Sequence, residues 1–315
     1  MARTAEASGS GALGASAQTA PERRRAALRG HAAMLAFALT ISVSFTLGKR
    51  AVPHLSPEAI TAARFLVACL VIGALALPAL RIDHLAGLWR YGVIGGLFAA
   101  YFVLMFEALS LTDPVSVAAI FTLTPAMSAG FGWLLLGQRA SVGMLCALAL
   151  GAAGALWVVF RGDLAALLAV DLGPGEWLFL LGCLAHAAYT PLTKKLSRGE
   201  PAPVFAFGAL AAGLLVTLAW GGSGVLRTDW ASLPPVAIAA VLYLGLAATA
   251  LTFLLTRFAA ARLPSGKVMA YGYLVPVFVI LWEGMLTGNW VALPVWLGVV
   301  ATIGALAMLL VEHDR

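Results

Sequence analysis

Ten long apolar runs fill the sequence almost from end to end, and they constrain the fold more than any other feature. A transmembrane helix needs about 20 mostly apolar residues. Punctuation by Pro, Gly and charged residues places the expected spans at 31–50, 57–78, 88–111, 114–137, 141–160, 176–197, 202–221, 234–256, 264–286 and 291–311. The sequence therefore predicts an all-α integral membrane protein with ten transmembrane helices, in which neighbouring helices pack antiparallel because most connections are very short.

The composition agrees with a protein dissolved in lipid. Of the 315 residues, 62% are hydrophobic and only 11% are charged, whereas soluble domains have about 45–50% apolar and about 25% charged residues. The net charge of +6 does not indicate nucleic-acid binding, because the basic residues lie between apolar runs and do not form a basic face. We expect the lipid bilayer, and no nucleic acid, as a partner.

The distribution of Lys and Arg predicts the orientation. When the connections are assigned alternately to the two sides, only Lys49, Arg50, Arg161 and Arg227 fall on one side, and all other Lys and Arg except Arg64 fall on the other. Cytoplasmic loops carry the excess of basic residues. The expected location is therefore a multi-pass protein of the inner (plasma) membrane with both termini in the cytoplasm.

An internal repeat is visible in spans four and nine. Pro125 is followed by Gly137 at the same spacing at which Pro276 is followed by Gly288. Five helices in each half is an odd number, so the halves are expected to be inverted, as in many secondary transporters. The predicted organisation is a disordered cytoplasmic tail (1–30), a first five-helix repeat (31–160), a linker loop (161–175), a second repeat (176–311) and a cytoplasmic C-terminus (312–315).

Several short motifs make residues 31–311 resemble the EamA-type permeases of the drug/metabolite transporter superfamily. They are Arg64-Phe65 in span two, the prolines inside spans four and nine with Leu-Val-Pro-Val-Phe at 274–278, and the exit from span eight at residues 259–264. The family commonly ends its fourth span in each half with Gly-Glu, but here these positions read Gly137-Gln138 and Gly288-Asn289, so no role is carried over for those acids. The resemblance implies ten helices in two five-helix domains. It also implies export or uptake of amino acids, related metabolites or amphipathic drugs.

Four ionisable residues within the expected spans stand out: Arg64, Glu107, His186 and Glu283. Such groups are costly in lipid and are candidates for function. Arg64 is the expected partner of one of the glutamates, either as a gate or substrate clamp or as a static ion pair between helices. A glutamate in the headgroup zone is a further alternative. His186, near the middle of span six, either binds substrate or carries a proton, or is bonded to a hydroxyl of the next helix.

Aromatic and proline residues complete the candidate site. Aromatic side chains expected to line a central cavity are Tyr101, Tyr189, Tyr271, Tyr273 and Trp282, each with packing as the alternative. The prolines expected to kink helices or act as hinges are Pro125, Pro191 and Pro276. No catalytic residues, cofactor or metal site are expected.

These features predict a secondary transporter that moves a small molecule by alternating access. No Gly-x-x-x-x-Gly-Lys-Ser/Thr motif is present, so an ion or substrate gradient is the expected source of energy, and the proton is a candidate coupling ion. The alternatives are a membrane-embedded transferase-type enzyme and a non-transporting scaffold, and the chain could act as a monomer or a homodimer.

Overall fold

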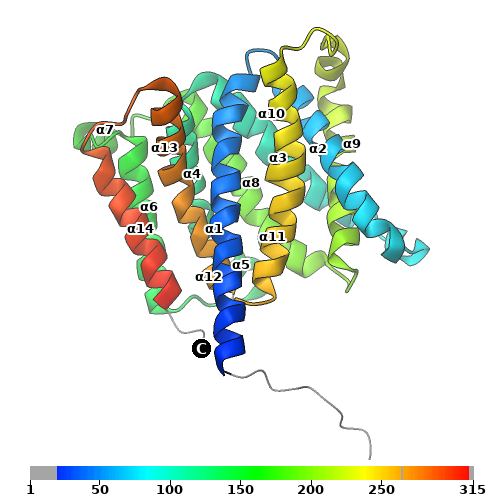
Figure 1. Cartoon of the computed structure of the whole chain (residues 1–315), viewed down its shortest axis with the longest axis horizontal. Helices are drawn as coiled ribbons and strands as arrows, with labels where there is room; N and C mark the ends of the chain where they lie inside the picture. Colours follow the sequence, from blue (N-terminus) through cyan, green and yellow to red (C-terminus); the bar gives the residue numbers. More distant parts are fainter. Residues whose placement is uncertain (1–19, 264, 312–315) are drawn as a thin grey trace, which may run out of the picture.

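The computed structural model describes residues 20–263 and 265–311, and every regular element within them is a helix, as predicted (Figure 1). The first half contains α1 (Ala20–Ala51), α2 (Pro57–Ala76), η1 (Leu77–Ala79), η2 (Ile82–Leu85), α3 (Trp89–Leu111), α4 (Pro114–Phe121), α5 (Thr124–Leu136) and α6 (Val142–Val159). The short helix α7 (Leu164–Ala169) follows. The second half contains α8 (Pro174–Leu196), α9 (Ala202–Arg227), α10 (Pro235–Gly245), the π-helical turn η3 (Leu246–Leu251), α11 (Thr252–Ala260), α12 (Ser265–Ala270), η4 (Tyr271–Leu274), α13 (Val275–Thr287) and α14 (Val295–Val311).

In the described part of the chain, eight helical segments are long and apolar enough to cross a membrane. They are α1, α2 with η1, α3, α4 with α5, α6, α9, α10 with η3 and α11, and α12 with η4 and α13. Helix α14 is apolar but has only 17 residues. Helix α8 has 23 residues but carries polar side chains that include His186, Thr190 and Thr193. The chain is a multi-pass membrane protein.

Helix α1 begins at Ala20, so the prediction of a disordered tail over residues 1–30 is wrong for residues 20–30. This segment is rich in Ala and Arg, which are strong helix formers. Glu22 in the first turn adds a favourable interaction with the helix dipole. Residues 1–19 and the expected C-terminal segment 312–315 lie outside the described residues.

The two helices that carry the repeated Pro–Gly pattern have equivalent structures. Pro125 lies in the first turn of α5 and Pro276 in the first turn of α13, and both helices have 13 residues. A proline cannot donate a backbone hydrogen bond to the preceding turn, so the regular α-helix starts afresh at each of them. Gly137 (φ 66°) and Gly288 (φ 75°) end these helices in the left-handed conformation, which glycine adopts without steric cost.

The two halves interlock and do not form separate bundles. Helix α3 packs against α8 and α9, while α1 packs against α10, α11 and α13. Helices α4 and α5 also pack against α8, and α2 against α9 and α10. Each helix has a counterpart in the other half: α1 and α8, α2 and α9, α3 and α10 with α11, α4 with α5 and α12 with α13. Exchanging the counterparts converts each of these contacts into a contact of the same set, and the α2–α9 contact into itself. Helix α6 packs against its own counterpart, α14.

Helix α1 begins and α14 ends at the same end of the bundle (Figure 1), which we call the basic end. An ion pair is buried there between Arg90 of α3 and Glu200 of the α8–α9 connection, with Nη2 2.7 Å from Oε1 and side chains 2% and 4% exposed. Burial raises the pKa of Glu200, but hydrogen bonds from the Arg198 backbone N–H and the Arg90 side chain outweigh it and lower the pKa to about 2. Arg90 Nη1 also donates to the Leu196 carbonyl at 2.7 Å. This pair ties the start of α3 to the connection between α8 and α9.

Adjacent glycines of α3 allow a test of the α3–α9 contact. A Cβ atom at Gly95 would lie 2.4 Å from both the Ala209 O and the Gly213 N of α9, whereas a Cβ at Gly96 has nothing within 4 Å. We expect Gly95→Ala to lower the free energy of unfolding by about 1–3 kcal/mol, because backbone cannot give way as a flexible side chain does. Gly96→Ala should be neutral or stabilising, by up to about 1 kcal/mol, through helix propensity. Thermal unfolding in detergent measures both, and equal effects would show that α3 and α9 do not approach this closely.

Candidate functional site

A cavity of about 330 Å³ lies between the two halves of the bundle. Helices α1, α2, α3, α4 and α5 of the first half and α8, α9, η3, α11, α12 and η4 of the second contribute its walls. Phe37, Tyr189, Thr256 and Met269 line it in the half of the bundle nearer the basic end, and all four are partly exposed. The cavity therefore extends from the middle of the bundle toward the basic end.

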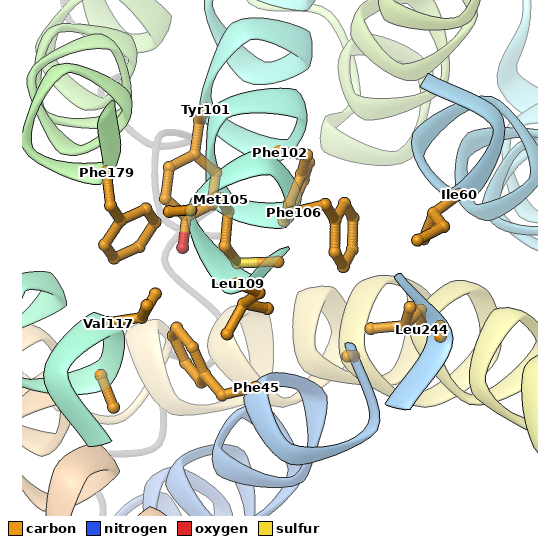
Figure 2. Packing of buried hydrophobic residues seen from close by; sticks show 14 of the residues in the cluster. Phe45, Ile60, Tyr101, Phe102, Met105, Phe106, Leu109, Val117, Phe179 and Leu244 are labelled. Carbon is orange, nitrogen blue, oxygen red and sulfur yellow. The ribbon is translucent and has the colours of Figure 1, made fainter. Parts of the chain in front are cut away.

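The opposite end of the bundle is filled by apolar side chains. Phe45, Leu109, Val117 and Phe179, from α1, α3, α4 and α8, converge there together with Phe106 (Figure 2). These five side chains, which we call the plug, are at most 1% exposed. Each lies within about two turns of the helix end that faces away from the basic end. The cavity is thus closed on one side and accessible on the other.

Arg64 is the charged residue in the cavity wall, and its surroundings differ from the prediction. Its Nε donates to Thr249 Oγ1 at 2.7 Å and its Nη2 to the Ala248 carbonyl at 3.1 Å. The guanidinium carbon lies 3.6 Å from the ring centroid of Phe102. Although the side chain is buried, Nη1 has no hydrogen-bond partner among the described residues. The expected pairing of Arg64 with a glutamate is wrong in this structure.

The π-helical turn η3 explains how Arg64 is held. A π-turn adds a residue to the helix and displaces carbonyls from the regular ladder. Thr249 lies in this turn, where its hydroxyl donates to the Leu244 carbonyl at 2.8 Å and accepts from Arg64. Ala248 of the same turn supplies a second acceptor. The guanidinium is therefore oriented by neutral groups that leave its positive charge uncompensated.

His186 of α8 lies in an aromatic part of the wall. Its ring centroid is 4.5 Å from that of Tyr101, 5.8 Å from Tyr189, 5.9 Å from Phe121 and 6.3 Å from Phe98. Nδ1 of His186 is buried without a hydrogen-bond partner in the described part of the chain. The same holds for the hydroxyl of Thr124, which also lines the cavity. Leaving a buried polar group unpaired costs about 1–3 kcal/mol, so a ligand that bonds to these groups would recover that cost.

The two candidate glutamates do not line the cavity. Glu283 of α13 lies near the opposite end, where its Oε1 is 3.4 Å from Arg50 Nη1. Glu107 of α3 is half-buried, and its carboxylate has no ion pair or hydrogen bond with another described residue. Arg64 of α2, which packs against α3 and η3, is the formally charged side chain in the described cavity wall.

The other candidates divide into cavity residues and packing residues. Tyr101, Tyr189 and Pro125 line the cavity. Three aromatic candidates lie elsewhere: Tyr271 is hydrogen-bonded to His31 at 2.9 Å, Trp282 donates to Ser42 Oγ at 2.9 Å, and Tyr273 is buried against Gly151 of α6. Pro191 is buried inside α8 and Pro276 in the first turn of α13, and neither lines the cavity.

Hydroxyl groups of η3 and α11 form a part of the wall that is not among the residues expected from the sequence. Thr249, Thr252 and Thr256 line the cavity together with Phe253. Their spacing of three or four residues places them on one helix face, and this pattern was available in the sequence. Within the described ranges, no three His, Cys, Asp or Glu side chains are grouped so that they could hold a metal ion.

The pairing of Glu283 with Arg50, and not with Arg64, can be tested by double-mutant cycles. Arg50→Gln and Glu283→Gln should couple by about 0.2–1 kcal/mol, as expected for a partly exposed ion pair. Arg64→Gln and Glu283→Gln should be additive within about 0.3–0.5 kcal/mol, since the residues share no contact. Unfolding free energies measured in mixed micelles give both cycles. A coupling well above 1 kcal/mol between Arg64 and Glu283 would contradict the observed arrangement.

Comparison with known proteins places this architecture in a family. The sequence model of the EamA-like transporter family matches two segments, residues 28–160 and 173–311. Comparison with curated protein sequences gives no match. A crystal structure of a protein with 21% sequence identity has a TM-score of 0.65, and the alignment covers 90% of this chain and 97% of that chain, so the two share a fold. Because the two matched segments make up most of the sequence and repeat one family pattern, the chain belongs to the EamA-like transporter family, within the drug/metabolite transporter superfamily.

Proposed function

We propose that this protein is a secondary transporter for small organic acids that combine a carboxylate with an apolar or aromatic body. The observation that carries the proposal is Arg64, a buried guanidinium with an unpartnered Nη1 in the wall of a cavity that is otherwise lined mostly by aromatic and apolar side chains, with hydroxyl groups among them. An arginine binds a carboxylate through charge-assisted hydrogen bonds, which are about twice as strong as neutral ones. Hydrophobic amino acids and amphipathic drugs that carry a carboxylate fall within this class.

The arrangement of the cavity supports transport by alternating access. It lies between two interlocked repeats, is closed by the plug at one end and extends toward the basic end at the other. In secondary transporters the substrate site lies between such repeats, and one repeat moves against the other. A non-transporting scaffold would need no cavity of about 330 Å³ reached from one side.

In this proposal α8 and α14 also cross the membrane, which gives ten spans in two inverted five-helix repeats. The exchange symmetry of the helix contacts supports the repeat, and the odd number of spans in each half inverts it. The basic end, with its excess of Lys and Arg, faces the cytoplasm of the inner membrane, together with both termini. In this proposal the chain acts as a monomer or as a homodimer.

The substrate class can be tested with matched ligands that differ only in charge. We expect 3-phenylpropionate to raise the thermal stability of the purified protein, whereas 3-phenylpropionamide and 2-phenylethylamine should not. Binding to the folded state stabilises it by mass action, by about 2.7 kcal/mol at a ligand concentration 100 times Kd. Arg64→Met keeps an apolar side chain against Phe102 and should abolish the shift while the protein still folds.

The control for this experiment is Arg50→Met, which removes an arginine outside the cavity and should retain the shift. Uptake of the labelled carboxylate into proteoliposomes should follow the same pattern across the variants. Stabilisation by the amide as strongly as by the acid, or a full shift in Arg64→Met, would exclude Arg64 as the carboxylate site.

We further propose that a proton is the coupling ion and that His186 carries it. Of the three acid–base candidates, only His186 lines the cavity, where Arg64, Tyr101 and Tyr189 are the neighbouring ionisable groups. An imposed pH gradient should then change the uptake rate in proteoliposomes, and His186→Gln should remove the dependence while substrate exchange at equal pH persists. Wild-type rates that ignore the gradient would rule out proton coupling.

A further inference from the structure

We propose that Lys49 and Lys194 are alternating latches, one for each end of the cavity. In the present state Lys49 holds the end opposite the basic end closed. When the cavity opens to that side, Lys194 closes the basic end by binding the last carbonyl groups of α11. The inference rests on the alternating access proposed above, and it adds the residues that stabilise each closed end.

The Lys49 latch is visible in the structure. Lys49, in the last turn of α1, donates from Nζ to the Leu109 carbonyl at 2.7 Å and to the Thr112 carbonyl at 2.9 Å. These are the final carbonyls of α3, which have no partner within their own helix. A lysine ammonium bonds favourably to such groups and to the negative end of the helix dipole. The contact joins α1 to α3 directly beside the plug residue Leu109.

Lys194 occupies the equivalent position in the second half. Lys49 precedes the end of α1 at Ala51 by two residues, and Lys194 precedes the end of α8 at Leu196 by two residues. The two family matches begin at residues 28 and 173, and each lysine lies the same number of residues after the start of its match. Since the halves have opposite directions, Lys194 lies at the basic end.

The partner of Lys194 is missing in the present state. Lys194 is exposed and makes no hydrogen bond or ion pair with any residue that the structure describes. Helix α3 corresponds to α11, yet α8 packs against α3, α4 and α5, while α11 packs against α1, η3 and α12. Among the described residues, the bonds from Lys49 to the end of α3 therefore have no formed counterpart between Lys194 and the end of α11. This is the asymmetry expected when one end of an inverted repeat is closed and the other open.

The neighbouring lysine provides a matched control. Lys195 corresponds to Arg50, which pairs with Glu283. Glu283 follows Pro276 at the same spacing at which Gly132 follows Pro125, so Gly132 is the residue equivalent to Glu283. Lys195 therefore has no carboxylate partner at the position that corresponds to Glu283. Like Lys194, Lys195 is exposed in the last turn of α8. A variant of Lys195 thus removes the same charge, one residue away, without removing a latch.

Distances between spin labels, measured by pulsed electron–electron double resonance, test the proposal in the full chain. With the three native cysteines replaced, one spin-label pair at Ser197→Cys and Ala260→Cys reports the basic end. A second pair at His54→Cys and Ser110→Cys reports the opposite end. These four positions are exposed in the structure. Transport by each labelled background is confirmed first.

We expect Lys49→Met to shift the populations toward a short distance at the basic end and a long one at the opposite end. Lys194→Met should shift them the other way. Two charge-assisted hydrogen bonds are lost in each case, so the population ratio should change about tenfold or more. Lys49→Arg should keep the wild-type population ratio because arginine also donates to carbonyls. Lys195→Met should leave this ratio unchanged.

The outcomes separate this proposal from the proposed function. Unchanged distances in both Lys49→Met and Lys194→Met would overturn the latches, and so would equal effects of Lys194→Met and Lys195→Met. If the Arg64-dependent stabilisation by 3-phenylpropionate persisted in those variants, the substrate site would stand without the latches. A single, invariant distance at both ends in every variant and with ligand would instead exclude alternating access and the latches with it.

Discussion

A helix that crosses lipid must satisfy its backbone hydrogen bonds internally, and it can depart from regular geometry only where protein or a cavity replaces the missing partners. Departures from it occur at the α4–α5 junction, in the π-turn η3 and in the turn η4, and α9 is also kinked at Gly221. Residues of the first three segments, including Thr124, Thr249 and Gly272, line the cavity. The irregular backbone of the α4–α5 junction, η3 and η4 therefore shapes the site, and the position of Arg64 depends on the acceptors that η3 exposes.

The sequence was sufficient for the features that depend on one helix at a time. Hydropathy located the long helices to within a few residues at most ends, and the paired Pro125 and Pro276 located two interruptions, because proline acts on its own helix. The start of α1 was missed, since apolar content identifies the segment in lipid and not the helix that continues beyond it. The π-turn has no comparable signature in the sequence.

Features that depend on several helices were less accessible. Depth in the membrane can be counted in residues along each expected helix, and this count places Arg64, Glu107 and Glu283 at similar depth. An ion pair between Arg64 and one of the glutamates is therefore a reasonable expectation. The structure packs α2 against α9 and α10, whereas α13 packs against α1 and α4, which keeps Arg64 and Glu283 apart. In a chain that is apolar on almost every face, helical periodicity does not reveal which neighbour a side chain meets. For the same reason Tyr273 was placed in the cavity, although it packs on α6.

The polar side chains in the cavity wall also have a consequence for biosynthesis. A helix enters the bilayer from the insertion machinery largely according to its own apolar content. Helix α8 carries His186 and several hydroxyl groups and, despite its 23 residues, is not among the described segments that are apolar enough to qualify alone. It packs against α3, α4 and α5, which are synthesised before it. In the proposed ten-span arrangement, entry of α8 into the membrane is therefore expected to depend on contact with these helices of the first half.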